Sequence, residues 1–336
     1  MPINTKPVEI ISPMAWGNGA YVVHRTLERH IDGYKVRGYH PNWTFIPLSI
    51  NKIAPRQNAR LVHTTPDYAF FSHCKNIPLI ISFQNYVLDH WMGQYSTWWQ
   101  RLHYRTDLRL WTRMAVKKAA IITAVSKFTG ELVKKDLNVK RRIQVIYNAA
   151  DEKVFTPGNL NKPNTKEVRV LYSGNLTLRK GAHWLPAIAD KLDKHVRIYY
   201  TQGLRTRNTL SEHANLRSIG PVPFEEMPAR YRQMDILLMP TVREGFSLSV
   251  LEAMACGLPV VASDCSSLPE QIDEGQGGFL CPVGAVDCFA ERLNQLADSP
   301  KERKEMGQFN RSKIEEHFTV EKMINEYKRL FETILV

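Results

Sequence analysis

Short apolar runs that alternate with longer polar or periodic stretches limit the fold of this chain more than any other feature. Runs of this length are typical of strands buried on both faces, and the stretches between them are long enough for helices. The pattern therefore predicts an α/β fold with mostly parallel sheets covered by helices. The predicted strands are 8–12, 59–63, 78–83, 120–124, 143–146, 168–172, 196–200, 216–219, 236–239 and 259–262.

The alternation occurs twice, on either side of a stretch rich in Pro, Gly and Asn at residues 151–166. Such a composition marks a linker, and 336 residues are about twice the length of one domain. We therefore predict two Rossmann-like αβα domains, 1–160 and 161–319, with an interdomain cleft, since open α/β sheets bind ligands beyond the carboxyl ends of their strands. Apolar residues at helical spacing predict a terminal helix over 320–336 that packs back toward the N-terminal domain.

Five cysteines without a C-x-x-C pair argue against a zinc site and against a disulfide framework. The histidines lack metal-ligand spacing, and we interpret most of them as surface or packing residues. We therefore expect no metal and no bound cofactor. No apolar stretch approaches the roughly 20 residues of a membrane-spanning helix, and the N-terminus lacks the apolar run of a signal peptide. The expected location is the cytoplasm.

The net charge of +12 is unevenly distributed along the chain. Residues 1–150 hold 21 Lys and Arg against 8 Asp and Glu, whereas the other 186 residues hold 24 against 25. The basic surplus therefore lies in the first half. It favours an anionic partner there, which can be nucleic acid, a membrane surface or an anionic small substrate.

The segment 240–262 carries the strongest chemical signal. A strand ends at Pro240, and a glycine-containing loop leads into a helix near Ser247. The amides at a helix start and the aligned peptide dipole favour an anion such as phosphate. Glu244 lies one loop before this point and Glu252 lies one turn inside the helix, so both can accept hydrogen bonds from sugar hydroxyls around a bound diphosphate. Taken singly, Glu252 fits an exposed helix residue and Glu244 a first-turn acid, but the spacing of the whole segment favours a nucleotide-sugar site.

The string Glu-x7-Glu followed by Ala-Met-Ala-Cys-Gly-Leu-Pro-Val-Val-Ala-Ser resembles the glycogen synthase-like signature of family 4 of the retaining glycosyltransferases. Further matches lie at 172–181, 220–223 and 231–240, with looser ones at 123–128 and 145–149. The resemblance implies the GT-B fold, in which the C-terminal domain binds a UDP- or GDP-sugar as co-substrate. It also implies that the N-terminal domain binds the acceptor and that transfer retains the anomeric configuration without a metal.

The resemblance also implies roles for individual residues. Lys180 is expected at the donor diphosphate, Glu252 at the ribose hydroxyls, Val222 at the base and Glu244 at the sugar hydroxyls. The candidate catalytic residues are Glu244, Lys180 and Gln84. The residues expected to bind the donor are Gly174, Asn175, Arg179, Lys180, Val222, Glu244, Gly245, Phe246, Ser247, Leu248 and Glu252. The residues expected on the acceptor side are Gly17, Asn18, Gly19 and Asn85, although Gly17 and Gly19 also fit an ordinary tight turn.

Two residues depart from the family pattern. Asn175 stands where many relatives have an arginine, so one cation at the diphosphate is missing unless Arg179 or Arg243 supplies it. Gln84 stands where many relatives have a histidine that touches the sugar. Because an amide neither takes up nor releases a proton at neutral pH, Gln84 can form hydrogen bonds but cannot act as a general base. The mechanism suggested for the family tolerates this, since the leaving phosphate oxygen can itself receive the acceptor's proton.

A basic and aromatic segment extends over residues 98–118, which we predict to form one helix. Its cations recur every four residues with apolar residues between them. The pattern indicates peripheral attachment to the inner face of an anionic membrane, or an anionic acceptor; a solvated basic face over a packed apolar stripe is an equal alternative. The cations are Arg101, Arg105, Arg109, Arg113 and Lys117, and the apolar residues are Trp98, Trp99, Leu102, Leu108, Trp111 and Met114.

The main hypothesis is a retaining, metal-independent glycosyltransferase. It moves a sugar from a nucleotide sugar to a lipid-linked or phosphorylated glycan in polysaccharide or glycoconjugate synthesis. A catalytically silent GT-B protein that binds nucleotide sugars or membranes is the first alternative, favoured by Gln84 and Asn175. A nucleic-acid binder has only the basic first half in its favour, because no recognition motif is present. A phosphorylase or sugar-nucleotide epimerase on the same fold is a further chemical alternative.

Overall fold

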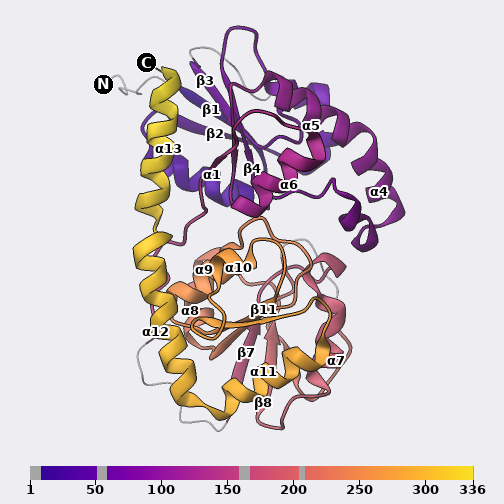
Figure 1. Cartoon of the computed structure of the whole chain (residues 1–336), viewed down its shortest axis with the longest axis vertical. Coiled ribbons are helices and arrows are strands. Elements are labelled where there is room, and N and C mark those ends of the chain that lie inside the picture. The colour runs from indigo at the N-terminus through magenta and orange to yellow at the C-terminus, as the bar shows by residue number, and fades with distance from the viewer. Residues whose placement is uncertain (1–8, 51–58, 159–166, 204–208, 336) are drawn as a thin grey trace. The chain divides into compact units, whose positions relative to one another are not determined.

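The computed structural model describes residues 9–50, 59–158, 167–203 and 209–335. The chain divides into two compact units, unit 1 with residues 1–148 and 321–336, and unit 2 with residues 149–320 (Figure 1). Val8 of the first predicted strand and residues 159–166 of the predicted linker lie outside the described residues. Among the described helices, none is both long enough and apolar enough to cross a membrane.

Unit 1 contains, within its described residues, a six-stranded parallel sheet in the order β2-β1-β3-β4-β5-β6. Its strands are β1 Ile10–Ala15, β2 Tyr34–Tyr39, β3 Leu61–Thr64, β4 Leu79–Phe83, β5 Ile121–Ala124 and β6 Gln144–Val145. Its α-helices are α1 Gly19–His30, α3 Ala69–Ser72, α4 Trp98–Arg105, α5 Asp107–Lys118, α6 Lys127–Leu137 and α13 Val320–Leu335. The strand order reverses between β1 and β3. The loops that follow these two strands therefore lie at the carboxyl edge of the sheet, where open α/β sheets bind ligands.

Unit 2 repeats this architecture with the strand order β12-β11-β10-β7-β8-β9, again parallel throughout the described part. Its strands are β7 Val168–Tyr172, β8 Val196–Tyr200, β9 Leu216–Ser218, β10 Ile236–Met239, β11 Val260–Ser263 and β12 Gly278–Cys281. Its α-helices are α7 Leu185–Ala189, α8 Met227–Arg232, α9 Leu248–Ala255, α10 Leu268–Gln271, α11 Val286–Asp298 and α12 Pro300–His317. The reversal lies between β7 and β10. The predicted α/β fold with two Rossmann-like units is confirmed.

Burial explains why most strands were predictable. All four residues of β10 are fully buried, because helices cover both faces of a parallel sheet, and such a strand is a continuous apolar run in the sequence. Every predicted strand has an observed counterpart, but β2 and β12 were missed. In β2, the charged residues Lys35 and Arg37 interrupt the apolar pattern, because this strand lies at the edge of the sheet. The β12 run is short and begins with glycine.

Two histidines, His24 and His63, are fully buried in unit 1 and are packing residues. The Tyr34 hydroxyl lies 2.8 Å from His24 Nδ1 and 2.7 Å from His63 Nδ1, and the two imidazole rings stack with centroids 4.5 Å apart. Burial lowers the pKa of His24 to about 3, so this ring is neutral at physiological pH. The His63 ring also contacts Tyr327 and Phe331, which attaches α13 to the core of unit 1.

Candidate functional site

The candidate site lies at the carboxyl edge of the unit 2 sheet, in the loops that follow β7 and β10. These strands are neighbours at the reversal of strand order, so their loops meet although they lie more than 60 residues apart in the sequence. The Val242 amide donates a hydrogen bond to the Arg179 carbonyl at 2.9 Å, and Thr241 Oγ1 lies 2.9 Å from the same carbonyl oxygen. The strand order therefore assembles the site.

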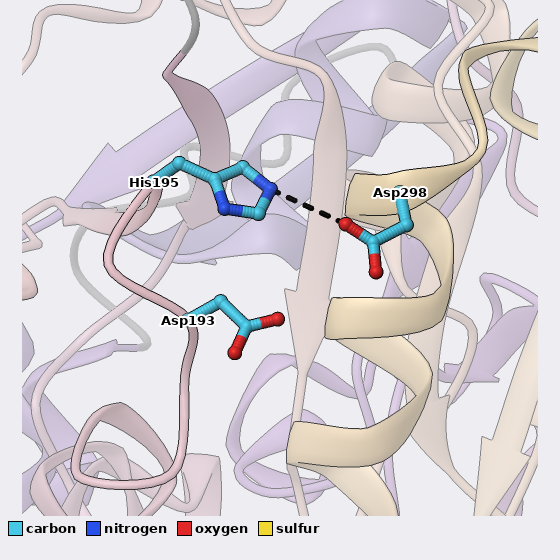
Figure 2. Close-up of side chains that lie close together, drawn as sticks. All are labelled: Asp193, His195 and Asp298. Carbon is cyan, nitrogen blue, oxygen red and sulfur yellow. Dashed lines mark ion pairs between the residues drawn. The ribbon is translucent and has the colours of Figure 1, made fainter.

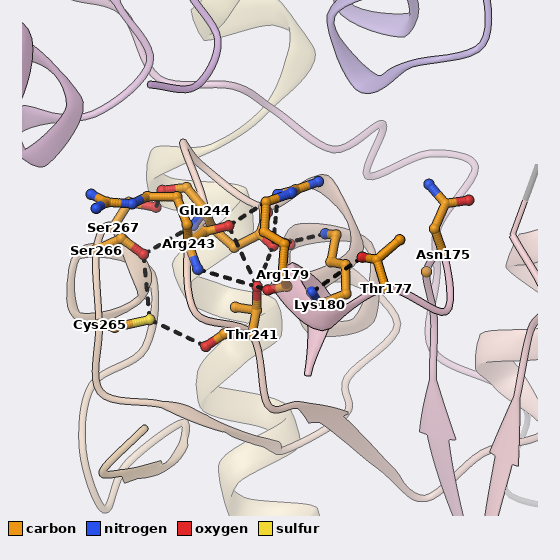
Figure 3. A network of polar contacts seen from close by, with 12 residues as sticks. Asn175, Thr177, Arg179, Lys180, Thr241, Arg243, Glu244, Cys265, Ser266 and Ser267 are labelled. Carbon is orange, nitrogen blue, oxygen red and sulfur yellow. Dashed lines mark hydrogen bonds and ion pairs between the residues drawn. The ribbon is translucent and has the colours of Figure 1, made fainter. Parts of the chain in front are cut away.

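Glu244 is the centre of a charged cluster in these loops (Figure 3). Its Oε1 atom lies 2.8 Å from Lys180 Nζ and 3.9 Å from a guanidinium nitrogen of Arg179, and accepts a hydrogen bond from Thr241 Oγ1 at 2.9 Å. Burial by itself would raise the pKa of Glu244, but Lys180 and then Arg179 outweigh it, and the pKa is lower than usual for glutamate. Glu244 is therefore an ionised carboxylate that can only accept hydrogen bonds at neutral pH.

Gly181 allows the turn that carries Lys180 to approach the end of β10. The 3₁₀ turn Leu178–Lys180 is capped by Thr177, whose Oγ1 accepts a hydrogen bond from the Lys180 amide at 3.4 Å. The turn ends at Gly181, which has φ of 72°. A Cβ atom at this position would lie 1.7 Å from the Pro240 carbonyl oxygen. Only glycine fits here, and the close approach places Lys180 beside Glu244.

Glu252 occupies a different environment in the middle of α9. It is buried, with 9% of its surface exposed, so the interpretation as an exposed helix residue is wrong. The Tyr231 hydroxyl donates a hydrogen bond to Glu252 Oε2 at 2.9 Å. Burial raises the pKa of Glu252 to about 7, and this hydrogen bond only partly opposes the rise. The pKa values of the two predicted carboxylates are thus shifted in opposite directions, that of Glu244 downward by its cations and that of Glu252 upward by burial.

The raised pKa of Glu252 predicts a pH-dependent contribution to stability. Between pH 4.5 and about 7, the folded protein holds a proton on Glu252 that the unfolded chain has released. Folding is therefore favoured at the acidic end, and this contribution is lost as the pH rises through the window. We expect Glu252→Gln, which cannot ionise, to gain on the order of 3 kcal/mol relative to wild type between pH 5 and pH 8. Urea unfolding at several pH values measures this, and a pH-independent difference between the two proteins would contradict it.

The start of α9 is held by a residue that the sequence did not reveal. The helix that the sequence predicts to begin near Ser247 has this residue as its N-cap, but the Ser247 hydroxyl makes no capping hydrogen bond. The Ser247 amide donates to Gln271 Oε1 at 2.9 Å, and Gln271 Nε2 donates to the Ser247 carbonyl at 2.9 Å. The neighbouring Phe246 is buried against Phe318, with ring centroids 5.2 Å apart. Packing of Phe246 and the hydrogen bonds of the Ser247 backbone therefore fix the helix start. Gly245 precedes these two residues in the loop, and Leu248 is the first helical residue.

The other predicted donor residues lie in loops at the same edge of unit 2. Gly174 follows β7, and its amide donates to Thr201 Oγ1 at 3.0 Å. Asn175 lies apart from the charged cluster, as Figure 3 shows, so it does not take the place of a second cation there. Arg179 does lie at the cluster, where it donates to the Arg243 carbonyl at 3.1 Å. Val222 is half-buried in the loop after β9.

The predicted acceptor-side residues lie in loops after β1 and β4 of unit 1. Gly17 has φ of 72°, and Asn18 is the N-cap of α1, where its Oδ1 accepts from the Tyr21 amide at 2.7 Å. Gly19 is the first residue of that helix. Asn85 Oδ1 accepts a hydrogen bond from the Tyr86 amide at 2.7 Å. Within the described part of the chain, the buried Nε2 atom of Gln84 has no hydrogen-bond partner, so this amide has donor capacity to offer a ligand.

The basic segment 98–118 is not one helix, contrary to our prediction. The backbone turns at Thr106, with φ of −104° and ψ of −98°, and separates α4 from α5. Arg109 forms an ion pair with Asp136 at 2.9 Å and also donates to the Leu88 carbonyl at 3.2 Å. Arg109 is therefore committed to the fold of unit 1 and is not part of a continuous basic face. The four-residue repeat could not reveal this, because Asp136 lies 27 residues away.

Two family models match the sequence and together cover most of it. One, described as Glycosyltransferase Family 4, matches residues 7–154, and the other, described as Glycosyl transferases group 1, matches residues 167–299. The chain belongs to glycosyltransferase family 4. Its two parallel-sheet units are those of the GT-B fold.

Curated relatives of this family 4 protein share part of its length. It is 26% identical over 241 residues to the N-acetyl-α-D-glucosaminyl L-malate synthase of Bacillus anthracis, covering 66% of this chain and 62% of that protein. It is 30% identical over 197 residues to the D-inositol 3-phosphate glycosyltransferase of Corynebacterium urealyticum, covering 51% of this chain and 46% of that protein. The matched part thus spans about half to under two thirds of these relatives.

A solved structure with the same fold is that of HepE from Anabaena in complex with UDP-glucose. It superimposes with a TM-score of 0.77 at 17% sequence identity and covers 97% of this chain and 99% of that one. At this identity the likeness concerns the fold.

One group of potential metal ligands occurs in the described part of this family 4 protein: Asp193, His195 and Asp298 (Figure 2). Their ligand atoms lie within 4.8 Å of one another, and His195 Nε2 is 3.5 Å from Asp298 Oδ1. His195 precedes β8, so the group lies at the amino edge of the sheet, opposite to the edge that carries Lys180 and Glu244. Both carboxylates are exposed, and exposed acidic groups are common without an ion. The group is therefore separate from the candidate site.

Proposed function

We propose that this family 4 protein is a glycosyltransferase that takes its sugar from a UDP- or GDP-sugar. The observation that carries the proposal is the cluster of Lys180, Arg179 and the ionised Glu244 at the point where the unit 2 sheet reverses its strand order. A diphosphate needs fixed cations, and a sugar needs hydrogen-bond acceptors for its hydroxyls. The cluster has two cations within 4 Å of a carboxylate that can accept hydrogen bonds. The fold shared with HepE, which was solved with UDP-glucose, supports this choice of donor.

The roles follow from the charge state of each residue. Lys180 and Arg179 stabilise the negative charge that grows on the diphosphate as the bond to the sugar breaks. Glu244 accepts hydrogen bonds from the sugar hydroxyls, for which an ionised carboxylate is suited. Glu252 accepts from the ribose, and Val222 lies beside the base. Because Arg179 reaches the cluster, it supplies the second cation that Asn175 does not.

The primary test is a screen of nucleotide sugars for thermal stabilisation of the protein and for donor hydrolysis. We expect a UDP- or GDP-sugar to raise the melting temperature and to be hydrolysed slowly without an acceptor. Sugars without a nucleotide diphosphate serve as the control, because they lack the group that Lys180 binds. The proposal fails when no nucleotide sugar stabilises the protein or is consumed.

We further propose that transfer retains the anomeric configuration and needs no divalent cation. Lys180 and Arg179 provide the positive charge at the leaving diphosphate, and the leaving phosphate oxygen can receive the acceptor's proton without a general base at Gln84. We expect NMR of the product to show the anomeric configuration of the donor, and the rate to persist in EDTA. An inverted linkage, or activity restored only by added Mg²⁺ or Mn²⁺, would contradict this prediction.

For the acceptor, we propose a phosphorylated or lipid-linked glycan, with peripheral attachment of unit 1 to an anionic membrane. The basic surplus of residues 1–150 supports an anionic acceptor. The name of the Corynebacterium relative, which specifies inositol 3-phosphate, is in line with a phosphorylated acceptor.

A catalytically silent nucleotide-sugar-binding protein is the second candidate, and Gln84, an amide in place of a histidine, favours it. The two candidates differ in one readout. Both predict stabilisation by a nucleotide sugar, but only the transferase consumes it. Binding without hydrolysis or transfer to any tested phosphorylated or lipid-linked acceptor would favour the silent protein.

A further inference from the structure

A pocket within unit 1 lies between α4, the 3₁₀ helix His90–Tyr95 and the beginning of α5, with a volume of about 330 Å³. In Figure 1, α4 lies at the edge of unit 1, beyond α5. Basic and aromatic side chains line the pocket, among them Arg101, Arg105, Arg109 and Tyr104. The pocket is thus built from the basic segment, at a place distinct from the loops after β7 and β10.

The charges of the lining residues do not cancel. Arg109 is neutralised by its ion pair with Asp136 at 2.9 Å. Across the described residues, neither Arg101 nor Arg105 has a carboxylate within 4 Å, although both line the pocket. The remaining acid of the lining is Asp89, so a positive charge is left over. Like charges one helical turn apart repel each other, and a bound anion between Arg101 and Arg105 would remove that cost.

The same helix exposes its apolar side chains. Trp98, Trp99 and Leu102 are 60%, 72% and 46% exposed, and α4 has no buried residue. The alternative of a packed apolar stripe is therefore wrong for α4, whereas Leu108 of α5 is buried as that alternative expects. Large exposed apolar side chains do not contribute to binding a free phosphate ion in water. Indole rings next to cations are instead suited to the interface of a membrane, where one part of the side chain is apolar and the other is hydrated.

We propose that this pocket binds the phosphate of an anionic phospholipid headgroup through Arg101 and Arg105, while Trp98 and Trp99 enter the interfacial layer. α4 has only eight residues, so its two arginines and its tryptophans are within about 12 Å of one another along the helix axis. A headgroup at Arg101 therefore brings the indoles to the membrane surface. The proposal rests on the membrane attachment proposed above and assigns it to one pocket, rather than to the whole basic segment.

The test compares two double charge reversals in the full-length protein. Arg101→Glu with Arg105→Glu alters the pocket, and Arg113→Glu with Lys117→Glu is the matched control: these residues are also exposed, also one turn apart, and outside the pocket lining. Both variants change the net charge equally. Binding is measured by co-sedimentation with vesicles of phosphatidylcholine alone and of phosphatidylcholine with phosphatidylglycerol. We expect the pocket variant to bind anionic vesicles at least about tenfold more weakly than the control, since it loses charged hydrogen bonds as well as general attraction.

A second measurement separates the lipid from other anions. We expect Trp98→Ala with Trp99→Ala to lose vesicle binding too, and brominated phosphatidylglycerol to quench tryptophan fluorescence in wild type but less in this variant. Equal loss of binding in the two charge-reversed proteins would overturn the pocket while leaving membrane attachment intact. Absence of wild-type binding to anionic vesicles would overturn both and leave the donor assay unaffected. Binding of inorganic phosphate or of a single-stranded oligonucleotide that depends on Arg101 and Arg105, without vesicle binding, would also overturn the lipid assignment.

Discussion

Replacement of Lys180 by alanine is expected to reduce kcat/KM for the nucleotide sugar by about 10-fold to 150-fold. This range corresponds to a lost charged hydrogen bond of roughly 1.5 to 3 kcal/mol. The physical reason is that Lys180 supplies a cation to the diphosphate. Lys180 Nζ lies 2.8 Å from Glu244 Oε1 and Arg179 lies 3.9 Å from the same atom, so Arg179 cannot fully replace the Lys180 charge. Initial-rate kinetics of donor hydrolysis or transfer, at several donor concentrations, measure the effect.

Lys191→Ala is the matched control for this substitution. Lys191 also forms an ion pair, with Asp287 at 2.7 Å, but both side chains are exposed and lie away from the loops of the site. Exposed ion pairs contribute little, so the control is expected to keep wild-type kinetics. Circular dichroism establishes that both variants are folded. Folded Lys180→Ala with the kinetics of Lys191→Ala would remove Lys180 from the donor site.

Gly181→Ala is expected to have the largest effect on stability, on the order of 3 to 5 kcal/mol, with loss of donor use. Alanine is strained at φ of 72°, and its Cβ would stand 1.7 Å from the Pro240 carbonyl oxygen. The backbone must therefore separate the Lys180 turn from β10, which also takes Lys180 away from Glu244. Thermal and urea unfolding measure the loss of stability, and donor-induced stabilisation measures the loss of the site.

Gly275→Ala separates the two causes of this effect. Gly275 has nearly the same backbone conformation, φ of 74°, but a Cβ there would have nothing within 4 Å. This control therefore pays the conformational strain of about 1 kcal/mol without the collision. If Gly181→Ala destabilises the protein no more than Gly275→Ala, the close approach of the turn to Pro240 does not hold the site together.

The opposite pKa shifts of the two glutamates show what a sequence pattern contains and what it lacks. The spacing of Glu244 and Glu252 indicated two carboxylates near one helix start. It did not indicate that Glu244 is held ionised by Lys180, or that Tyr231 is the partner of buried Glu252. The pattern identified two glutamates, but their protonation depends on their neighbours in the fold. Lys180 lies 64 residues from Glu244 in the sequence, and Tyr231 lies 21 residues from Glu252.

The basic segment 98–118 also shows that residue spacing alone does not predict tertiary contacts. The repeat of cations every four residues assumed an unbroken helix, and Thr106 breaks it. Arg109 was grouped with Arg101 and Arg105 by spacing, yet Asp136 of α6 takes it into the fold. The sequence carries no local signal for either event, because an ion pair between α5 and α6 depends on how the two helices pack.

By itself, the sequence determined most strands of both units, β2 and β12 excepted, and the family. Strands covered on both faces are mostly apolar, so β7, β8 and β10 are visible as runs with their observed boundaries although β7 and β8 each contain one arginine. The loop after β10 is visible through its motif. The tertiary structure decided which of the motif's residues meet. Lys180 and Glu244 are neighbours only because the sheet reverses its order between β7 and β10, and Gly181 lets the two loops touch. Strand order arises from packing across the whole sheet, and no local stretch of the chain specifies it.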